Sequence, residues 1–122
     1  MNIRLDNFYF SVENMERAVK FYEEFLDIKA SNREGNRWTD FNTGNGLYFG
    51  LIDGTALEKT RKIGTNATLG IKTDDIQAAF EKAKKLGATI LYEPTDVPDS
   101  PYPYICFGML DTEGNIIEVS TF

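Results

Sequence analysis

Apolar residues recur at helical spacing in two segments of the chain. The first segment carries Met15, Ala18, Val19, Tyr22, Phe25 and Leu26, and the second carries Ile76, Ala79, Phe80, Ala83 and Leu86. Steps of three and four residues place each set on one helical face. Asn14 is a favourable N-cap for the first helix, and Asp74 or Asp75 for the second. Gly87 is expected to end the second helix. The pattern therefore predicts two amphipathic helices.

Short segments rich in β-forming residues, separated by Gly, Asn and Asp, flank both helices. They cover residues 3–12, 28–33, 37–42, 46–52, 66–73, 88–93, 103–110 and 115–121. The element order is therefore β-α-β-β-β, repeated once. Superposing Asn14 on Asp75 also aligns Phe10 with Ile71, without a change of offset. We interpret the chain as an α+β protein built by internal duplication, and chance similarity between two amphipathic helices is the alternative.

The length of 122 residues predicts one domain, residues 1–122. Within it we expect module one at about 1–52, a linker at 53–64 and module two at about 65–122. All four prolines lie between Pro94 and Pro103. Because proline cannot donate to a sheet, this segment is predicted to be a loop, either a semi-rigid lid or an ordinary surface connection.

Composition narrows the possible functions. Thirteen basic against nineteen acidic residues give a net charge of −6, which argues against nucleic-acid binding and favours cationic small ligands. The sequence contains no histidine, so imidazole is excluded as metal ligand and as general base. The single cysteine, Cys106, allows no internal disulfide and is expected to be a small buried hydrophobic residue.

The composition of the N-terminal residues and the length of the apolar runs predict where the protein is located. The first ten residues lack the apolar core of a secretory signal. The longest apolar run, Leu47 to Ile52, is far shorter than the ~20 residues that span a bilayer. We therefore expect a cytoplasmic protein with no membrane contact.

Two motifs carry a resemblance to a known superfamily. The segment from Phe10 through Asn14 to Leu26 is similar to a strand–helix signature with a Phe-Tyr pair, here Phe21-Tyr22. The segment Asp111-Thr-Glu-Gly-Asn-Ile-Ile-Glu118 is similar to a turn and final strand, with Thr112 in place of proline. Together they resemble the vicinal oxygen chelate superfamily, which includes glyoxalase I, bleomycin-resistance proteins and extradiol dioxygenases. The resemblance implies two tandem βαβββ modules with curved mixed sheets around a cleft, and a homodimer.

The resemblance also implies four positions where metalloenzymes of this superfamily hold a metal. In this sequence they are Asn7, Thr68, Glu118 and Tyr48, or Gly50 if the strand register shifts. Borderline metals such as zinc and iron prefer imidazole, thiolate or several carboxylates. One carboxylate beside an amide, a phenol and a hydroxyl is a poor set. The sequence therefore predicts no metal and no other cofactor.

Loss of the metal set is also seen in the drug-binding members of the superfamily, which use aromatic stacking and charge. Period-two alternation places Asn7, Tyr9 and Ser11 toward the cleft, and Phe8, Phe10 and Val12 toward the helix. The repeat extends this face to Tyr48, Thr68 and Glu118, and neighbouring strands add Trp38 and Tyr104. The predicted ligand-binding residues are Asn7, Tyr9, Trp38, Tyr48, Thr68, Tyr104 and Glu118, with no catalytic residue. Trp38 could instead belong to the core or to a dimer interface.

Three classes of function follow. The leading hypothesis is a metal-independent small-molecule binding protein that sequesters an antibiotic or another cationic or aromatic compound. The second is a metal-independent lyase or isomerase that uses Glu118 or Tyr48 as acid or base. The third is a regulatory module with a vestigial pocket. The expected partners are a small-molecule ligand and a second copy of the chain.

Overall fold

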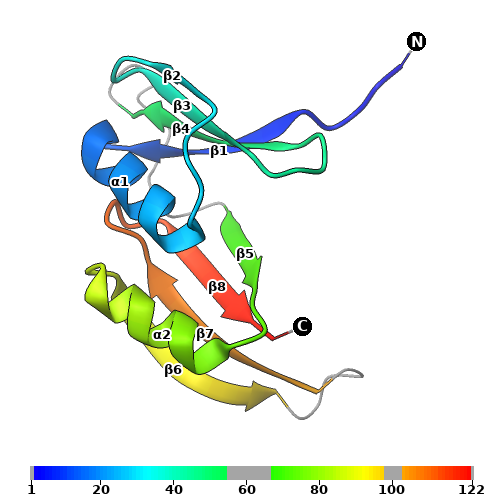
Figure 1. The fold of residues 1–122 in the computed structure, drawn as a ribbon, viewed down its shortest axis with the longest axis vertical. Helices are drawn as coiled ribbons and strands as arrows, with labels where there is room; N and C mark the ends of the chain where they lie inside the picture. The colour runs from blue at the N-terminus through cyan, green and yellow to red at the C-terminus, as the bar shows by residue number, and fades with distance from the viewer. Residues whose placement is uncertain (1, 55–66, 98–102, 122) are drawn as a thin grey trace. The chain divides into compact units, whose positions relative to one another are not determined.

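A computed structural model describes residues 2–54, 67–97 and 103–121 of the chain. All ten predicted elements are present within these residues, in the predicted order (Figure 1). They are β1 (Asn7–Val12), α1 (Met15–Leu26), β2 (Asn32–Glu34), β3 (Trp38–Asn42), β4 (Tyr48–Asp53), β5 (Thr68–Lys72), α2 (Ile76–Lys85), β6 (Thr89–Val97), β7 (Tyr104–Leu110) and β8 (Ile116–Ser120).

The chain divides into two compact units, Met1–Ile63 and Gly64–Phe122. The first contains a four-stranded sheet in the order β1-β4-β3-β2, and the second a four-stranded sheet in the order β5-β8-β7-β6. In each sheet the first and last strands of the module are parallel, and the other pairs are antiparallel. Each unit is therefore a βαβββ module with a mixed sheet, which confirms the α+β fold class. Of the predicted linker 53–64, Asp53 belongs to β4 and residues 55–64 lie outside the described residues.

Side-chain caps fix the start of both helices. The Oδ1 atom of Asn14 accepts a hydrogen bond from the backbone N–H of Arg17 at 3.0 Å, and Oδ1 of Asp75 accepts one from Ala78 at 3.0 Å. The second cap is therefore Asp75 and not Asp74. Gly87, with φ of +86°, follows α2 as predicted. Neither helix in the described parts of the chain is long and apolar enough to cross a membrane.

Each unit has its own aromatic core between its helix and its sheet. In the first, the ring of Tyr22 on α1 lies 4.9 Å from that of Phe49 on β4, edge to face. In the second, Phe80 on α2 lies 5.3 Å from Phe107 on β7, also edge to face. All four side chains are buried. Burial of one such ring contributes about 1.5–3 kcal/mol, so these contacts hold each helix on one face of its sheet.

Three strands differ from the sequence prediction by more than two residues at one end. The predicted strand 3–12 begins at Asn7, because β4 extends only to Tyr48, the residue opposite Asn7. The predicted strand 28–33 is reduced to Asn32–Glu34. The predicted strand 88–93 continues to Val97 and includes Pro94, which the sequence assigned to a loop. Pro94 is tolerated there because β6 is an edge strand with a register shift between Tyr92 and Thr95.

The turn before β8 explains the second sequence motif. The carboxylate of Asp111 is buried, and its Oδ1 accepts hydrogen bonds from the backbone N–H groups of Glu113 and Asn115 at 2.7 and 2.8 Å. Its Oδ2 accepts a third hydrogen bond from Nδ2 of Asn115. Gly114 adopts φ of +90°, which glycine tolerates best. The motif therefore fixes the β7–β8 register that places Glu118 opposite Gly108.

Candidate ligand-binding faces

The helix-free face of the first sheet is the face opposite α1, and it carries most of the residues predicted for the first module. It presents Asn7, Tyr9 and Ser11 from β1, Asn32 and Glu34 from β2, Trp38, Asp40 and Asn42 from β3, and Tyr48, Gly50 and Ile52 from β4. The intervening residues Phe10, Thr39, Phe41, Phe49 and Leu51 are buried on the other face. The predicted alternation along β1 therefore holds from Asn7 to Phe10, whereas Ser11, predicted on the helix-free face, is buried like Phe10 and Val12.

Trp38 lies across this face, over a glycine of the next strand. A Cβ atom on Gly50 would meet Cη2 of the indole and would lie 2.7 Å from its Cζ2, so a side chain there would displace the ring. Tyr9 contacts the indole from the other side of Gly50, with ring centroids 5.3 Å apart and planes at 73°. Such an edge-to-face pair adds about 0.5–1.5 kcal/mol beyond its buried area. Two of the predicted residues, Tyr9 and Trp38, are thus in direct contact.

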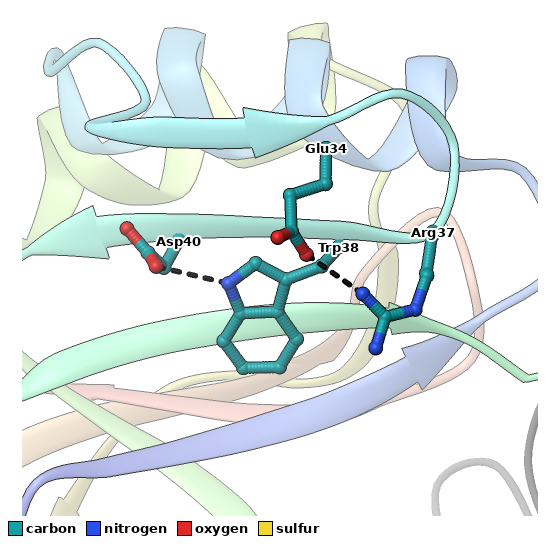
Figure 2. Close-up of polar contacts among 4 residues, drawn as sticks. All are labelled: Glu34, Arg37, Trp38 and Asp40. Atoms are coloured by element: carbon teal, nitrogen blue, oxygen red, sulfur yellow. Dashed lines mark hydrogen bonds and ion pairs between the residues drawn. The ribbon is translucent and has the colours of Figure 1, made fainter.

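Hydrogen bonds hold the indole and its neighbours in place (Figure 2). The Nε1–H of Trp38 donates to Oδ2 of Asp40 at 2.9 Å, and Nδ2 of Asn32 donates to Oδ1 of the same carboxylate at 2.9 Å. Glu34 pairs with Arg37 at 3.0 Å. Since its only N–H group is used by Asp40, the indole offers a ligand its π face alone.

A surface depression of about 430 Å³ opens beside these groups. It is lined by Asn32, Arg33, Glu34, Arg37, Trp38, Asp40 and Ile52. One aromatic ring, one aliphatic side chain and two carboxylates surround the space, together with two guanidinium groups. Such a lining suits a small molecule that presents a flat ring and hydrogen-bond donors. The sequence prediction of ligand-binding residues included Trp38 but not Asp40 or Glu34. Asp40 follows Trp38 by two residues on β3, and Glu34 lies opposite Trp38 on β2.

Asn7 and Tyr48, the other predicted residues of the first unit, lie directly opposite each other in the β1–β4 pair. Tyr48 is half-buried, whereas Asn7 is exposed and donates from Nδ2 to Asp6 at 2.8 Å. They share the helix-free face with Trp38 but do not line the depression.

In the second unit the predicted carboxylate, Glu118, has a partner that the sequence did not reveal. The hydroxyl of Tyr92 donates to Oε2 of Glu118 at 3.3 Å, and the Sγ atom of Cys106 lies 3.9 Å from the same hydroxyl. Cys106 is buried, as predicted. Partial burial raises the pKa of Tyr92 above its ordinary value of 10.0, and the neighbouring Cys106 and Glu118 raise that pKa further. The phenol is therefore a donor at any physiological pH.

A bulge places Tyr92 on this face. Ile90 pairs with Met109 and Tyr92 with Gly108, so Leu91 is one residue in excess on β6. Simple alternation would put Tyr92 beside Ile90, on the helix side. The ring lies over Gly108, where an added Cβ would be 2.8 Å from Cζ of Tyr92. The glycine of the neighbouring strand was the available signal, because it leaves room for an aromatic ring.

Thr68 and Tyr104 lie on the helix-free face of the second sheet, the face that carries Glu118. Neither is the residue opposite Glu118 in a strand pair. Thr68 is exposed and lies opposite Ile116, while Gly70 is the residue opposite Glu118. Tyr104 is half-buried at the start of β7.

The strand register corrects one of the four inherited metal positions. Tyr9 lies opposite Gly50 in the first sheet as Gly70 lies opposite Glu118 in the second, so Gly50 is the repeat equivalent of Glu118. Counting four residues on from Gly44, as Glu118 lies four residues after Gly114, leads instead to Tyr48, because the two loops differ in length. The corrected set offers one carboxylate, one amide and one hydroxyl, which does not fit a borderline metal ion. Among the described residues, no three His, Cys, Asp or Glu side chains gather as a metal site.

The chain matches the Glyoxalase/Bleomycin resistance protein/Dioxygenase superfamily over residues 4–119. It belongs to that family, and the resemblance read from the sequence is confirmed. No curated protein matches the chain.

Solved structures show the same fold. A glyoxalase/bleomycin resistance protein/dioxygenase family enzyme from Burkholderia phytofirmans PsJN is 16% identical, with a TM-score of 0.82 over 97% of this chain and 98% of that one. An integron cassette protein from the mobile metagenome of V. cholerae is 26% identical, with a TM-score of 0.71 over 100% and 98%. TioX from Micromonospora sp. ML1 is 18% identical, with a TM-score of 0.71 over 97% and 98%.

Proposed function

We propose that the protein binds a small cationic aromatic compound on the helix-free face of the first sheet, without a metal and without chemical conversion of the ligand. The observation that carries this proposal is the way in which the indole of Trp38 is held against the sheet. Gly50 leaves room beneath the indole, Tyr9 supports it from one side, and Asp40 holds its N–H. A ring fixed in this way loses little conformational freedom when a ligand stacks on it.

The charge of the compound follows from the groups around the indole. A π face attracts cations, and the attraction is about 0.5–1 kcal/mol at exposed sites and more when desolvated. The carboxylates of Asp40 and Glu34 line the same depression, and the chain carries a net charge of −6. Arg33 and Arg37 also line it, and the pairing of Arg37 with Glu34 leaves Asp40 as the carboxylate next to the ring.

The residue types support metal-independent binding. The inherited metal positions supply a single carboxylate, and the sequence has no histidine with which to complete a site. The family description includes bleomycin resistance proteins, and this supports an antibiotic among the compounds to be screened.

The test is a binding screen with compounds matched in shape and different in charge. Planar aromatic compounds bearing an ammonium or amidinium group are compared with neutral and carboxylated analogues, by calorimetric titration in the presence of EDTA. We expect saturable binding of the cationic members, and the compound is recovered unchanged. Asp40→Asn should lose the preference for cations, while Asn42→Asp, on the same strand and outside the depression, should keep it. Equal affinity for all three charge classes, or turnover of the bound compound, contradicts the proposal.

A further inference from the structure

The N-terminal arm, residues 2–6, is the most exposed apolar segment among the described residues. Its sequence, Asn-Ile-Arg-Leu-Asp, alternates apolar and polar residues. Ile3 is 85% exposed and Leu5 84% exposed, more than any other large hydrophobic residue of the described chain. Figure 1 shows the arm as an extended segment that continues the line of β1 away from its sheet. Alternation of this kind is typical of a half-buried strand, yet the arm is covered by nothing that the structure describes.

The backbone of the arm likewise pairs with no described strand of this chain. The β1–β4 ladder begins at Asp6, whose carbonyl accepts a hydrogen bond from the N–H of Tyr48 at 2.9 Å. Before it, within the described residues, the backbone of residues 2–5 makes no hydrogen bond to another part of the chain. β1 is itself an edge strand of its sheet. An exposed extended segment with free donors and acceptors is a template for pairing with another strand.

We propose that residues 2–8 pair antiparallel with the same residues of a second copy of this chain, with the two-fold axis at Leu5. In this register Leu5 lies opposite Leu5 of the second copy, and Ile3 is its diagonal neighbour on the same face. Ile3 and Leu5 of both copies then form one apolar cluster, in which these highly exposed side chains cover one another. Arg4 lies opposite Asp6 of the second copy, and this ion pair occurs twice.

The charges select this register over its neighbour. A shift that centres the axis on Arg4 pairs Ile3 with Leu5 but sets two arginines directly opposite each other, which is destabilising. Only the axis at Leu5 places both charged side chains of the arm, Arg4 and Asp6, opposite a residue of the other charge. The homodimer expected from the sequence thereby acquires a specific interface, in which the arm of each copy pairs with Asn7 and Phe8 at the start of β1 of the other.

Charge reversal with rescue tests the register. Dissociation constants of the full chain are measured by sedimentation or light scattering for the wild type, Arg4→Asp, Asp6→Arg and the double variant, with circular dichroism to confirm folding. Each single reversal replaces two attractive pairs by two repulsive ones and should raise the dissociation constant about tenfold. The double variant should restore the wild-type value. A monomeric wild type, or a dimer that none of the reversals weakens, overturns the proposal.

A cross-linking experiment tests the axis directly. In a Cys106→Ala background, Leu5→Cys places the two new thiols opposite each other, with Cα atoms about 4.5–5.5 Å apart, within disulfide range. Arg4→Cys is the matched control, because its two copies are diagonal and beyond that range. We expect rapid oxidation to a covalent dimer for position 5 alone. Equal cross-linking at both positions, or a preference for position 4, contradicts the register.

Discussion

Gly50 of β4 lies directly beneath the six-membered ring of Trp38 on β3, and no Cβ atom fits between them. The same relationship occurs in the second sheet, where Gly108 of β7 lies beneath Tyr92 of β6. In each unit the glycine lets an aromatic ring of the neighbouring strand lie across the face opposite the helix. Trp38 donates a hydrogen bond to Asp40, and Tyr92 donates one to Glu118. By leaving room for these rings, the two glycines allow the carboxylate on each face to accept its hydrogen bond.

The first prediction concerns the contact between Gly50 and the ring of Trp38. Gly50→Ala forces the indole of Trp38 away from the sheet and should lower the free energy of unfolding by about 1–3 kcal/mol, as overpacking does. Trp38 is the only tryptophan, so its fluorescence emission reports the displacement. Gly70→Ala is the matched control, since nothing lies within 4 Å of an added Cβ there. An unchanged emission spectrum in Gly50→Ala would show that the ring is not held where the structure places it.

The second prediction concerns Glu118. Because Glu118 does not line the depression beside Trp38, we expect Glu118→Gln to preserve the fold and to change the affinity for a cationic compound bound there by less than about 0.5 kcal/mol. Calorimetric titration measures the difference, with circular dichroism as the control for folding. A loss of about 1.5–3 kcal/mol, the range for hydrogen bonds to charged groups, would contradict a site confined to the first sheet and place Glu118 among the ligand-binding residues.

The third prediction concerns pH. The pKa of Tyr92 is raised in the folded chain, so the folded state holds this proton more tightly than the unfolded state. The resulting stability is fully present below about pH 10, the unfolded value, and is lost as the pH rises toward the folded one. The stability difference between the wild type and Tyr92→Phe, from urea unfolding at pH 8 and pH 11, should therefore shift in favour of the variant at the higher pH. A difference that is constant with pH would mean that the phenol titrates normally.

The fourth prediction concerns the helix caps. Asn14→Ala and Asp75→Ala each remove one acceptor from an orphan backbone N–H, and each should cost about 1 kcal/mol of stability. Asp74→Ala, next to the second cap and outside it, is the control and should change stability by much less. Chemical denaturation of the three variants measures these effects. A larger loss at Asp74 than at Asp75 would contradict the assigned cap.

Local sequence patterns were sufficient to predict the helices and strands, and the faces that Asn7 to Phe10 of β1 present. Helix spacing located both helices, and caps at Asn14 and the Asp74–Asp75 pair set their starts, because these signals are local. Alternation placed Tyr9 and Asn7 on the face opposite Phe10, since that face is set by period two alone. The two motifs around Phe10 and Asp111 identified the family, because each fixes a turn or a helix entry through contacts between near neighbours.

The partners of the candidate site residues could be seen only in the folded chain. The equivalence of Gly50 with Glu118 depends on the register between strands, which loops of unequal length hide from a sequence alignment. The position of Tyr92 depends on one excess residue, Leu91, which turns the following side chains to the opposite face. Asp40 reaches Trp38 only because both project from the same side of β3. Hydrophobic pattern reports which face of a strand is buried, whereas register and bulges are set by pairing between strands distant in the chain, and that pairing brings the carboxylates to the aromatic rings.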